Sequence, residues 1–417
     1  MTSIPPLGLY HGWQPTIRVQ VKYFNDQHKT LFLAYPNAED VEKLVSKPVE
    51  IATPDFLTYY LFQRQDPGRP NFETYRSCGQ RHHITWADME DMIQHNGTSI
   101  QLPVSGTVPL GHVTEYVGDS IGLNVLNSLY NLHEADWRRI PIVNTNKTLD
   151  FNYKSSDGNV FIELETKGIS SPNNALRSGL SEPSGSINDK KVAQRGLPSG
   201  AGKMFYGTIT VLDALENSIA KCWLLDPPPD GERADPRTYR LLARLDFLSE
   251  WINFIAPTTH LAATLATRLQ DLAHLPNSFD LDGSPLRDGL GEPIRYVPFG
   301  NTTHSTFFAN RSRVVGSDAG GVIVPWSENE VAFFGVRQQI IDMSAEQVFD
   351  TILSYKFSPE QREAEVDCVI GEGRFNSMKL GDGVKSRKQN GYRLFTLKGL
   401  IQFSSGGLAF GVLPLKE

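Results

Sequence analysis

Hydrophobic and polar positions alternate along the segment from Lys147 to Gly168, and this period of two predicts a β-hairpin. Two runs rich in aromatic and β-branched residues flank 155–158, which ends in an Asp-Gly pair typical of tight turns. Because side chains on a strand point to alternate faces, Glu165 and Lys167 share one face of the second run. With Asp150 at the start of the first run, two carboxylates and a lysine can gather at one end of an apolar hairpin. Their desolvation has to be compensated by a metal ion or by mutual pairing.

The period changes upstream, where apolar residues recur every three or four positions from 113 to 132. This spacing predicts an amphipathic helix with one buried stripe. Gly118 and Gly122 lie inside it, and each glycine weakens a helix by up to about 1 kcal/mol. We therefore expect close packing there, against a sheet or a substrate. Glu115 and Asp119 are four residues apart on a flank of the stripe.

Around the hairpin, the patterns predict a first strand over 139–144, a short basic helix over 187–195, and strands over 204–212 and 219–225. The central part of the chain is thus ordered as helix, three strands, helix and strand.

The N-terminal part, 1–108, is expected to form a small α+β accessory or recognition domain. Alternation predicts a strand over 17–24 with a partner strand over 29–35. A capped helix is expected over 84–90, with Thr85 as its N-cap.

Helical patterns up to residue 275 complete a central domain, 109–275. The remaining part, 276–417, has strand patterns over 321–326, 331–336 and 391–403 and is expected to be a β-rich accessory domain. The expected fold class is therefore α/β, with a central mixed sheet between a small α+β domain and a β-rich domain.

The composition is ordinary for a globular protein, with 40% hydrophobic and 21% charged residues among 417. A net charge of −7 argues against a uniformly basic surface but allows a local basic groove. No apolar run has the length of a membrane span, the first residues do not resemble a secretory signal, and the three cysteines form no CxxC pair. We expect a cytoplasmic protein that does not bind membranes.

Asp150, a hairpin, and then Glu165-Thr166-Lys167 15 positions later resemble the motif of the PD-(D/E)XK, or restriction-endonuclease-like, nuclease superfamily. Leu149 stands where a proline often precedes the Asp. The resemblance implies a restriction-endonuclease-like mixed sheet flanked by helices, with the order of elements predicted above. It also implies metal-dependent hydrolysis of phosphodiester bonds, with DNA favoured over RNA, as in effectors of restriction or antiviral defence.

The resemblance also implies roles for single residues. Asp150, Glu165 and the backbone carbonyl of Thr166 would bind Mg²⁺, for which Mn²⁺ can substitute. Glu115 is the candidate for a further ligand from the helix, and an exposed helix carboxylate is the alternative. Lys167 would orient or help to deprotonate water and offset charge on the phosphate.

Three lysines are candidates for phosphate contacts: Lys190 and Lys191 on the basic helix, and Lys203. Lys203 ends the segment 196–203, which resembles a P-loop, but Met204 follows it where a P-loop needs Ser or Thr. We therefore expect no ATPase site.

A further basic surface is predicted between Arg374 and Lys398, where seven basic residues accompany a single acid, Asp382. Arg387 and Lys388 are its candidate nucleic-acid contacts, and a solvated basic loop is the alternative.

The expected partner is nucleic acid, and a homodimer or a larger defence complex is compatible with the chain. Two alternatives to a nuclease remain open. One is a catalytically inactive nucleic-acid-binding protein on a nuclease-like fold, and the other is a scaffold subunit.

Overall fold

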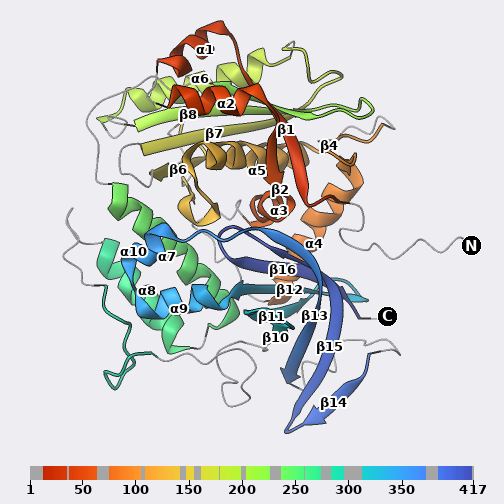
Figure 1. Cartoon of the computed structure of the whole chain (residues 1–417), viewed down its shortest axis with the longest axis vertical. Helices are drawn as coiled ribbons and strands as arrows, with labels where there is room; N and C mark the ends of the chain where they lie inside the picture. The colour runs from red at the N-terminus through yellow and green to blue at the C-terminus, as the bar shows by residue number, and fades with distance from the viewer. Residues whose placement is uncertain are drawn as a thin grey trace, which may run out of the picture. The chain divides into compact units, whose positions relative to one another are not determined.

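The computed structural model describes most of the chain, namely residues 13–34, 37–62, 75–104, 109–140, 147–154, 161–177, 179–198, 203–225, 236–257, 259–273, 283–294, 312–371 and 384–415. These residues form two compact units of mixed α/β structure (Figure 1). The first unit lies within Gly12–Asn71 and Thr85–Ala243, and the second includes Phe72–Ile84 and Arg244–Glu417.

The first unit is built on a mixed sheet of seven strands (Figure 1). In spatial order they are β2 (Val49–Ala52), β1 (Thr16–Tyr23), β9 (Ala220–Leu225), β8 (Lys203–Leu212), β7 (Phe161–Ser170), β6 (Phe151–Lys154) and β5 (Arg138–Arg139). The pairs β1–β9 and β7–β8 are parallel, and the other neighbours are antiparallel. The expected hairpin is present as β6–β7, in which Phe151 pairs with Leu164.

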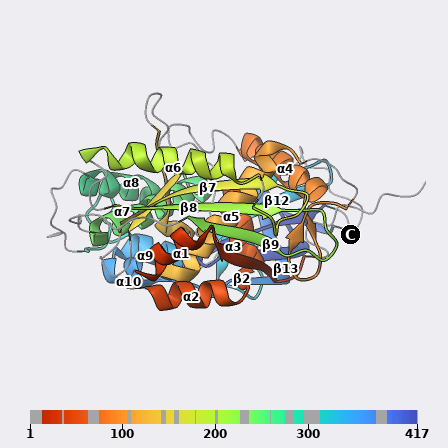
Figure 2. The same ribbon diagram turned by 90° about the horizontal axis from the view of Figure 1, so that it is seen from above.

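Two helices cover opposite faces of this sheet. A Cβ added to Gly122 of α5 (Gly111–Tyr130) would meet the side chains of Thr166 and Thr208. A Cβ added to Gly207, the neighbour of Thr208 on β8, would meet Ile187 of α6 (Ser181–Arg195). Because neighbouring residues of a strand face opposite ways, α5 and α6 lie on opposite faces. Figure 2 shows α6 running alongside β7 and β8.

The predicted order of helix, three strands, helix and strand is present as α5, β5, β6, β7, α6 and β8. Two boundaries differ from the prediction. The first strand is β5 (Arg138–Arg139), which shares only Arg139 with the predicted range 139–144, and 141–146 lie outside the described residues. The basic helix begins six residues earlier than expected.

The strand predicted over 29–35 is wrong, because the chain forms the helix α1 (Asp26–Leu33) there. Asn25 caps this helix, its Oδ1 accepting a hydrogen bond from the His28 N–H at 2.9 Å. The helix α2 (Ala38–Ser46) follows. The N-cap proposed for Thr85 is also wrong, since α4 (Tyr75–Met92) continues through it.

The strands β1 and β2 belong to the seven-stranded sheet and not to a separate N-terminal sheet. β1 pairs with β2 on one side and with β9, two hundred residues later in the chain, on the other. The helix α3 (Thr53–Phe62) packs against α5, and the short pair β3 (Gln94–His95) and β4 (Ile100–Gln101) completes this part. The two units therefore divide the chain differently from the predicted domains 1–108, 109–275 and 276–417.

The second unit contains the other large sheet. Its strands, in spatial order, are β13 (Glu360–Gly371), β10 (Ser312–Val314), β11 (Ala319–Pro325), β12 (Glu330–Arg337), β16 (Leu408–Pro414), β15 (Tyr392–Phe403) and β14 (Ser386–Gln389). β13 also pairs with β15, so the six strands from β13 to β15 form a closed sheet. β14 pairs with β15 at the end of the strand order. The β-rich character predicted for this part is confirmed. Buried Val, Phe and Leu side chains of these strands form a hydrophobic core.

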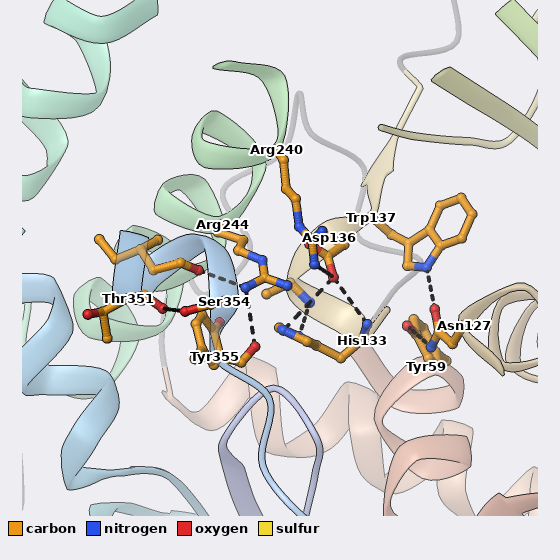
Figure 3. Close-up of polar contacts among 12 residues, drawn as sticks. Tyr59, Asn127, His133, Asp136, Trp137, Arg240, Arg244, Thr351, Ser354 and Tyr355 are labelled. Atoms are coloured by element: carbon orange, nitrogen blue, oxygen red, sulfur yellow. Dashed lines mark hydrogen bonds and ion pairs between the residues drawn. The ribbon is translucent and has the colours of Figure 1, made fainter. Parts of the chain in front are cut away.

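The helices of the C-terminal half are α7 (Pro236–Ile255), α8 (His260–Ala273), α9 (Gln338–Glu346) and α10 (Phe349–Ser354). α7 carries two buried arginines one turn apart (Figure 3). In the first unit, Arg240 Nε donates to Asp136 Oδ1 at 2.8 Å, next to the 3-10 helix Glu134–Asp136. In the second unit, Arg244 donates to the carbonyl of Ile352 at 2.7 Å. None of the described helices is long and apolar enough to span a membrane.

Candidate functional site

Backbone pairing in the hairpin brings Asp150 beside Glu165. The Asp150 N–H donates to the carbonyl of Leu164 at 3.0 Å, one residue beyond the Phe151–Leu164 pair. The Asp150 carbonyl in turn accepts the N–H of Ile140 at 2.9 Å. Two residues that are 15 positions apart in the sequence are therefore held side by side by main-chain hydrogen bonds.

Glu165 is the centre of a charged cluster that also contains Asp150, Lys167 and Lys190. The Glu165 side chain is 0% exposed, and its Oε1 lies 2.6 Å from Lys167 Nζ. Lys190 Nζ, from α6, lies 2.6 Å from Oε1 and 2.7 Å from Oε2. The same ammonium group is 3.8 Å from Asp150 Oδ1. The three residues predicted to be catalytic, Asp150, Glu165 and Lys167, are thus brought together on the face of the sheet that α6 covers.

The electrostatics of the cluster depend on burial as well as on charge. The pKa of Glu165 is raised to about 7, because burial and, to a smaller extent, the charge of Asp150 raise it more than Lys167 and Lys190 lower it. Burial lowers the pKa of Lys167, but the charges of Glu165, Asp150 and Glu115 outweigh it, so that the pKa is raised overall. Lys167 is therefore a stable ammonium group next to a carboxylate that can change its protonation near neutral pH.

Thr166 connects the cluster to the helix on the other face. Its N–H donates to Asp150 Oδ2 at 3.2 Å, and its hydroxyl donates to Asp119 Oδ1 and lies 3.5 Å from Asp150 Oδ2. Asp119 is buried on α5. The pattern of the sequence places Asp119 on the flank of the helix and indicates no role for it. Its place between Gly118 and Gly122, which bring α5 close to the sheet, is the signal that could have identified it.

Glu115, the predicted further ligand, lies one turn before Asp119 on α5. It acts on the cluster through its charge, which contributes to the raised pKa of Lys167. Asp119, the second acid on the flank of the helix, accepts a hydrogen bond from the hairpin through Thr166.

The lysines predicted to bind phosphate have three different environments. Lys190 belongs to the cluster. Lys191 is buried, and its Nζ donates to the carbonyl of Leu225 at 3.3 Å, which is a different environment from the exposed position expected of a phosphate contact. Lys203 pairs with Glu163, with 2.5 Å between Nζ and Oε1, and is 22% exposed. As predicted, a strand and not a helix follows the P-loop-like segment, of which 199–202 lie outside the described residues.

Arg387 and Lys388 lie on β14, all four residues of which are exposed. With Lys385 and Arg393 they form a basic ribbon at the start of β15, where Lys388 pairs directly with Arg393. Like charges on directly opposed residues destabilise a ribbon unless an anion lies nearby. No acidic residue occurs between 384 and 402, whereas Arg374 and Lys379 lie outside the described residues.

The cluster fits a divalent metal in the kind of donor it offers. Asp150 and Glu165 supply carboxylate oxygens, the ligands that Mg²⁺ prefers. The number of ligands is small, since the described residues contain no group of three or more His, Cys, Asp or Glu side chains that could hold a metal. In this structure, the positive charge near Glu165 comes from Lys167 and Lys190.

In comparisons with known proteins, no family model, no curated protein and no solved structure matches the chain.

Proposed function

We propose that this protein is a metal-dependent nuclease with a restriction-endonuclease-like core, whose active centre is the charged cluster. The observation that carries the proposal is the meeting of Asp150, Glu165 and Lys167 at the end of the β6–β7 hairpin, with 2.6 Å between Lys167 Nζ and Glu165 Oε1. Burial of such charges is costly, and active centres are where proteins accept this cost. The order α5, β5, β6, β7, α6, β8, with β7 parallel to β8, also supports the proposed core.

In this proposal, Asp150, Glu165 and the backbone carbonyl of Thr166 would hold Mg²⁺ or Mn²⁺, and Glu115 would add charge to the site. The bound ion would polarise the scissile phosphate and lower the pKa of a water molecule. Lys167 orients the attacking water by donating a hydrogen bond and offsets negative charge that builds up on the phosphate. Thr166 keeps Asp150 in place through its N–H.

The proposed substrate is nucleic acid, with DNA favoured. The basic ribbon supports a nucleic-acid substrate, because its exposed cations can contact backbone phosphates without sequence preference. Restriction or antiviral defence is the context that we propose by analogy with nucleases of this kind.

The direct test is incubation of the full chain with plasmid, linear and single-stranded DNA in Mg²⁺, in Mn²⁺ and in EDTA. We expect cleavage in either ion and none in EDTA. Asp150→Ala and Lys167→Ala should abolish cleavage and retain DNA binding. Lys43→Ala is the control, because Lys43 also pairs with a carboxylate, Asp40, but lies exposed on α2 outside the cluster. Cleavage that survives in Asp150→Ala would refute the proposal.

A second candidate is a nucleic-acid-binding or scaffold protein without catalytic activity. It is favoured by one observation, the contact of Glu165 with two ammonium groups, which balances its charge without a metal. Binding of DNA with no cleavage in any ion would support the binding protein. Native mass measurement with and without DNA would identify a scaffold that assembles with partners.

A further inference from the structure

Lys190 has an unusual position for a lysine on a helix that covers a sheet. Its Nζ contacts both carboxylate oxygens of Glu165, at 2.6 and 2.7 Å, and lies 3.8 Å from Asp150 Oδ1. It therefore occupies the place between the two carboxylates where a shared cation has the most favourable electrostatic energy.

Lys167 and Lys190 together use most of the capacity of Glu165 to accept hydrogen bonds. A carboxylate has about four lone-pair sites. Lys167 and Lys190 both contact Oε1, and Lys190 also contacts Oε2. A metal ion that binds Glu165 in its present position has to compete with Lys190 for the same oxygens.

The backbone of α6 is held firmly, but the tip of Lys190 can leave. Ile187 is buried against the sheet, and Lys191 is buried with its Nζ on the Leu225 carbonyl. Gln194 Nε2 donates to the carbonyl of Lys147 at 2.8 Å. Lys190 itself is 24% exposed, and its side chain has four rotatable bonds, so the ammonium can move to solvent without displacement of the helix.

We propose that Lys190 is a built-in counter-ion of Asp150 and Glu165, which a divalent cation has to displace in order to bind. The inference rests on the proposed function in that it takes these two carboxylates as metal ligands. Without the metal, Lys190 compensates the repulsion between the two carboxylates and the desolvation of Glu165. Once displaced, its ammonium lies beside the metal site, where a substrate phosphate is a suitable new partner.

The test is the affinity of the full chain for Mn²⁺ alone, measured by calorimetry without nucleic acid, so that the readout does not depend on activity. Lys190→Met removes the competing charge and keeps the length of the side chain, and we expect Mn²⁺ to bind at least tenfold tighter. Lys190→Arg offers a planar bidentate partner that a carboxylate holds more firmly, and we expect severalfold weaker binding. Lys203→Met is the matched control, with similar exposure and a similar glutamate pair, and should change the affinity less than twofold.

Unchanged or weaker Mn²⁺ binding in Lys190→Met overturns the inference, because it shows that Lys190 does not compete with the ion. If this variant does not fold, as judged by circular dichroism, Lys190→Arg decides, and Mn²⁺ binding at or above the wild-type affinity overturns the inference. The proposed function fails separately. If Lys190→Met binds Mn²⁺ more tightly but the wild-type protein cleaves no DNA substrate, the inference about Lys190 holds and the proposed nuclease function is refuted.

Discussion

Gly118 on α5 and Gly168 on β7 are in direct backbone contact: a Cβ added to Gly118 would lie 2.5 Å from the Gly168 nitrogen. A Cβ on Gly168 would in turn overlap the Thr114 carbonyl. This close approach brings Asp119, the next residue on the helix, within hydrogen-bonding distance of Thr166. The glycines that weaken the helix thus allow it to reach the hairpin that carries the charged cluster.

Gly118→Ala is expected to destabilise the protein by about 1–3 kcal/mol, because the added methyl group has to push backbone atoms apart. Urea denaturation measures the change in the free energy of unfolding. Gly185→Ala is the control: Gly185 is also helical, but a Cβ there would meet no atom within 4 Å, so we expect stabilisation by up to about 1 kcal/mol. Equal effects of the two substitutions would show that the contact with Gly168 is not tight.

Thr166→Val is expected to cost about 1–3 kcal/mol, because it leaves the buried Asp119 carboxylate without the hydroxyl that donates to it. Thr208 is a suitable control, since it pairs with Thr166 across β7 and β8 and is equally buried. Its hydroxyl has no hydrogen-bond partner among the residues that the structure describes, so Thr208→Val should be neutral or stabilising. If urea denaturation gave the same loss for both, the bond from Thr166 to Asp119 would not be its cause.

His82 provides a prediction for pH. It packs in the second unit against the ring of Phe334, at 5.7 Å between centroids. Burial, with a smaller effect of Arg81, lowers the pKa of His82 from 6.5 to about 3. The unfolded chain therefore protonates this histidine near pH 6.5, whereas the folded protein does so only near pH 3. The contribution of His82 to stability is complete above pH 6.5 and is lost as the pH falls towards 3.

His82→Phe removes this titration and keeps an aromatic ring next to Phe334. Between pH 6.5 and 5, we expect the wild type to lose up to about 1.4 kcal/mol per pH unit more than the variant. The free energy of unfolding from urea titrations at each pH is the measurement. Parallel curves for the two proteins would mean that folding does not lower the pKa of His82.

Reversal of charge on the basic ribbon should weaken DNA binding. Arg387→Glu with Lys388→Glu removes up to two phosphate contacts, so the slope of log affinity against log salt should fall by up to about 2. Fluorescence anisotropy at several salt concentrations measures both affinity and slope. The double reversal of Lys29 and Lys43, exposed on α1 and α2, changes the net charge equally and should leave the slope unchanged. A slope that falls equally in both proteins would assign the effect to net charge and not to the ribbon.

Much of the candidate site could be predicted from the sequence because its determinants are local. The alternation along the hairpin predicted which side chains share a face, and Glu165 and Lys167 do lie together on β7. The apolar stripe predicted α5, and its glycines predicted the close packing that the contact between Gly118 and Gly168 confirms. These inferences depend on the period of a single element, which follows from backbone geometry alone.

The pairing of strands and the environments of single side chains were decided by the tertiary structure, because local patterns do not contain them. The segment after β1 has enough β-branched and aromatic residues to resemble a strand, yet Asn25 caps a helix there, and β1 finds its partners in β2 and β9. Adjacent lysines on α6 also have different environments, because Lys190 contacts Glu165 whereas Lys191 is buried against the Leu225 carbonyl.

The sequence by itself determined the helix α5, the β6–β7 hairpin and its faces, and the meeting of Asp150, Glu165 and Lys167, because these follow from neighbours along the chain. Only the tertiary structure decided which strands pair across the sheet, that Asp119 is the acid bonded to Thr166, and that Lys190 completes the cluster. The physical reason is that these relationships depend on the rotation and depth of one packed element against another. At a contact as close as that of α5 and β7, a single methyl group changes both.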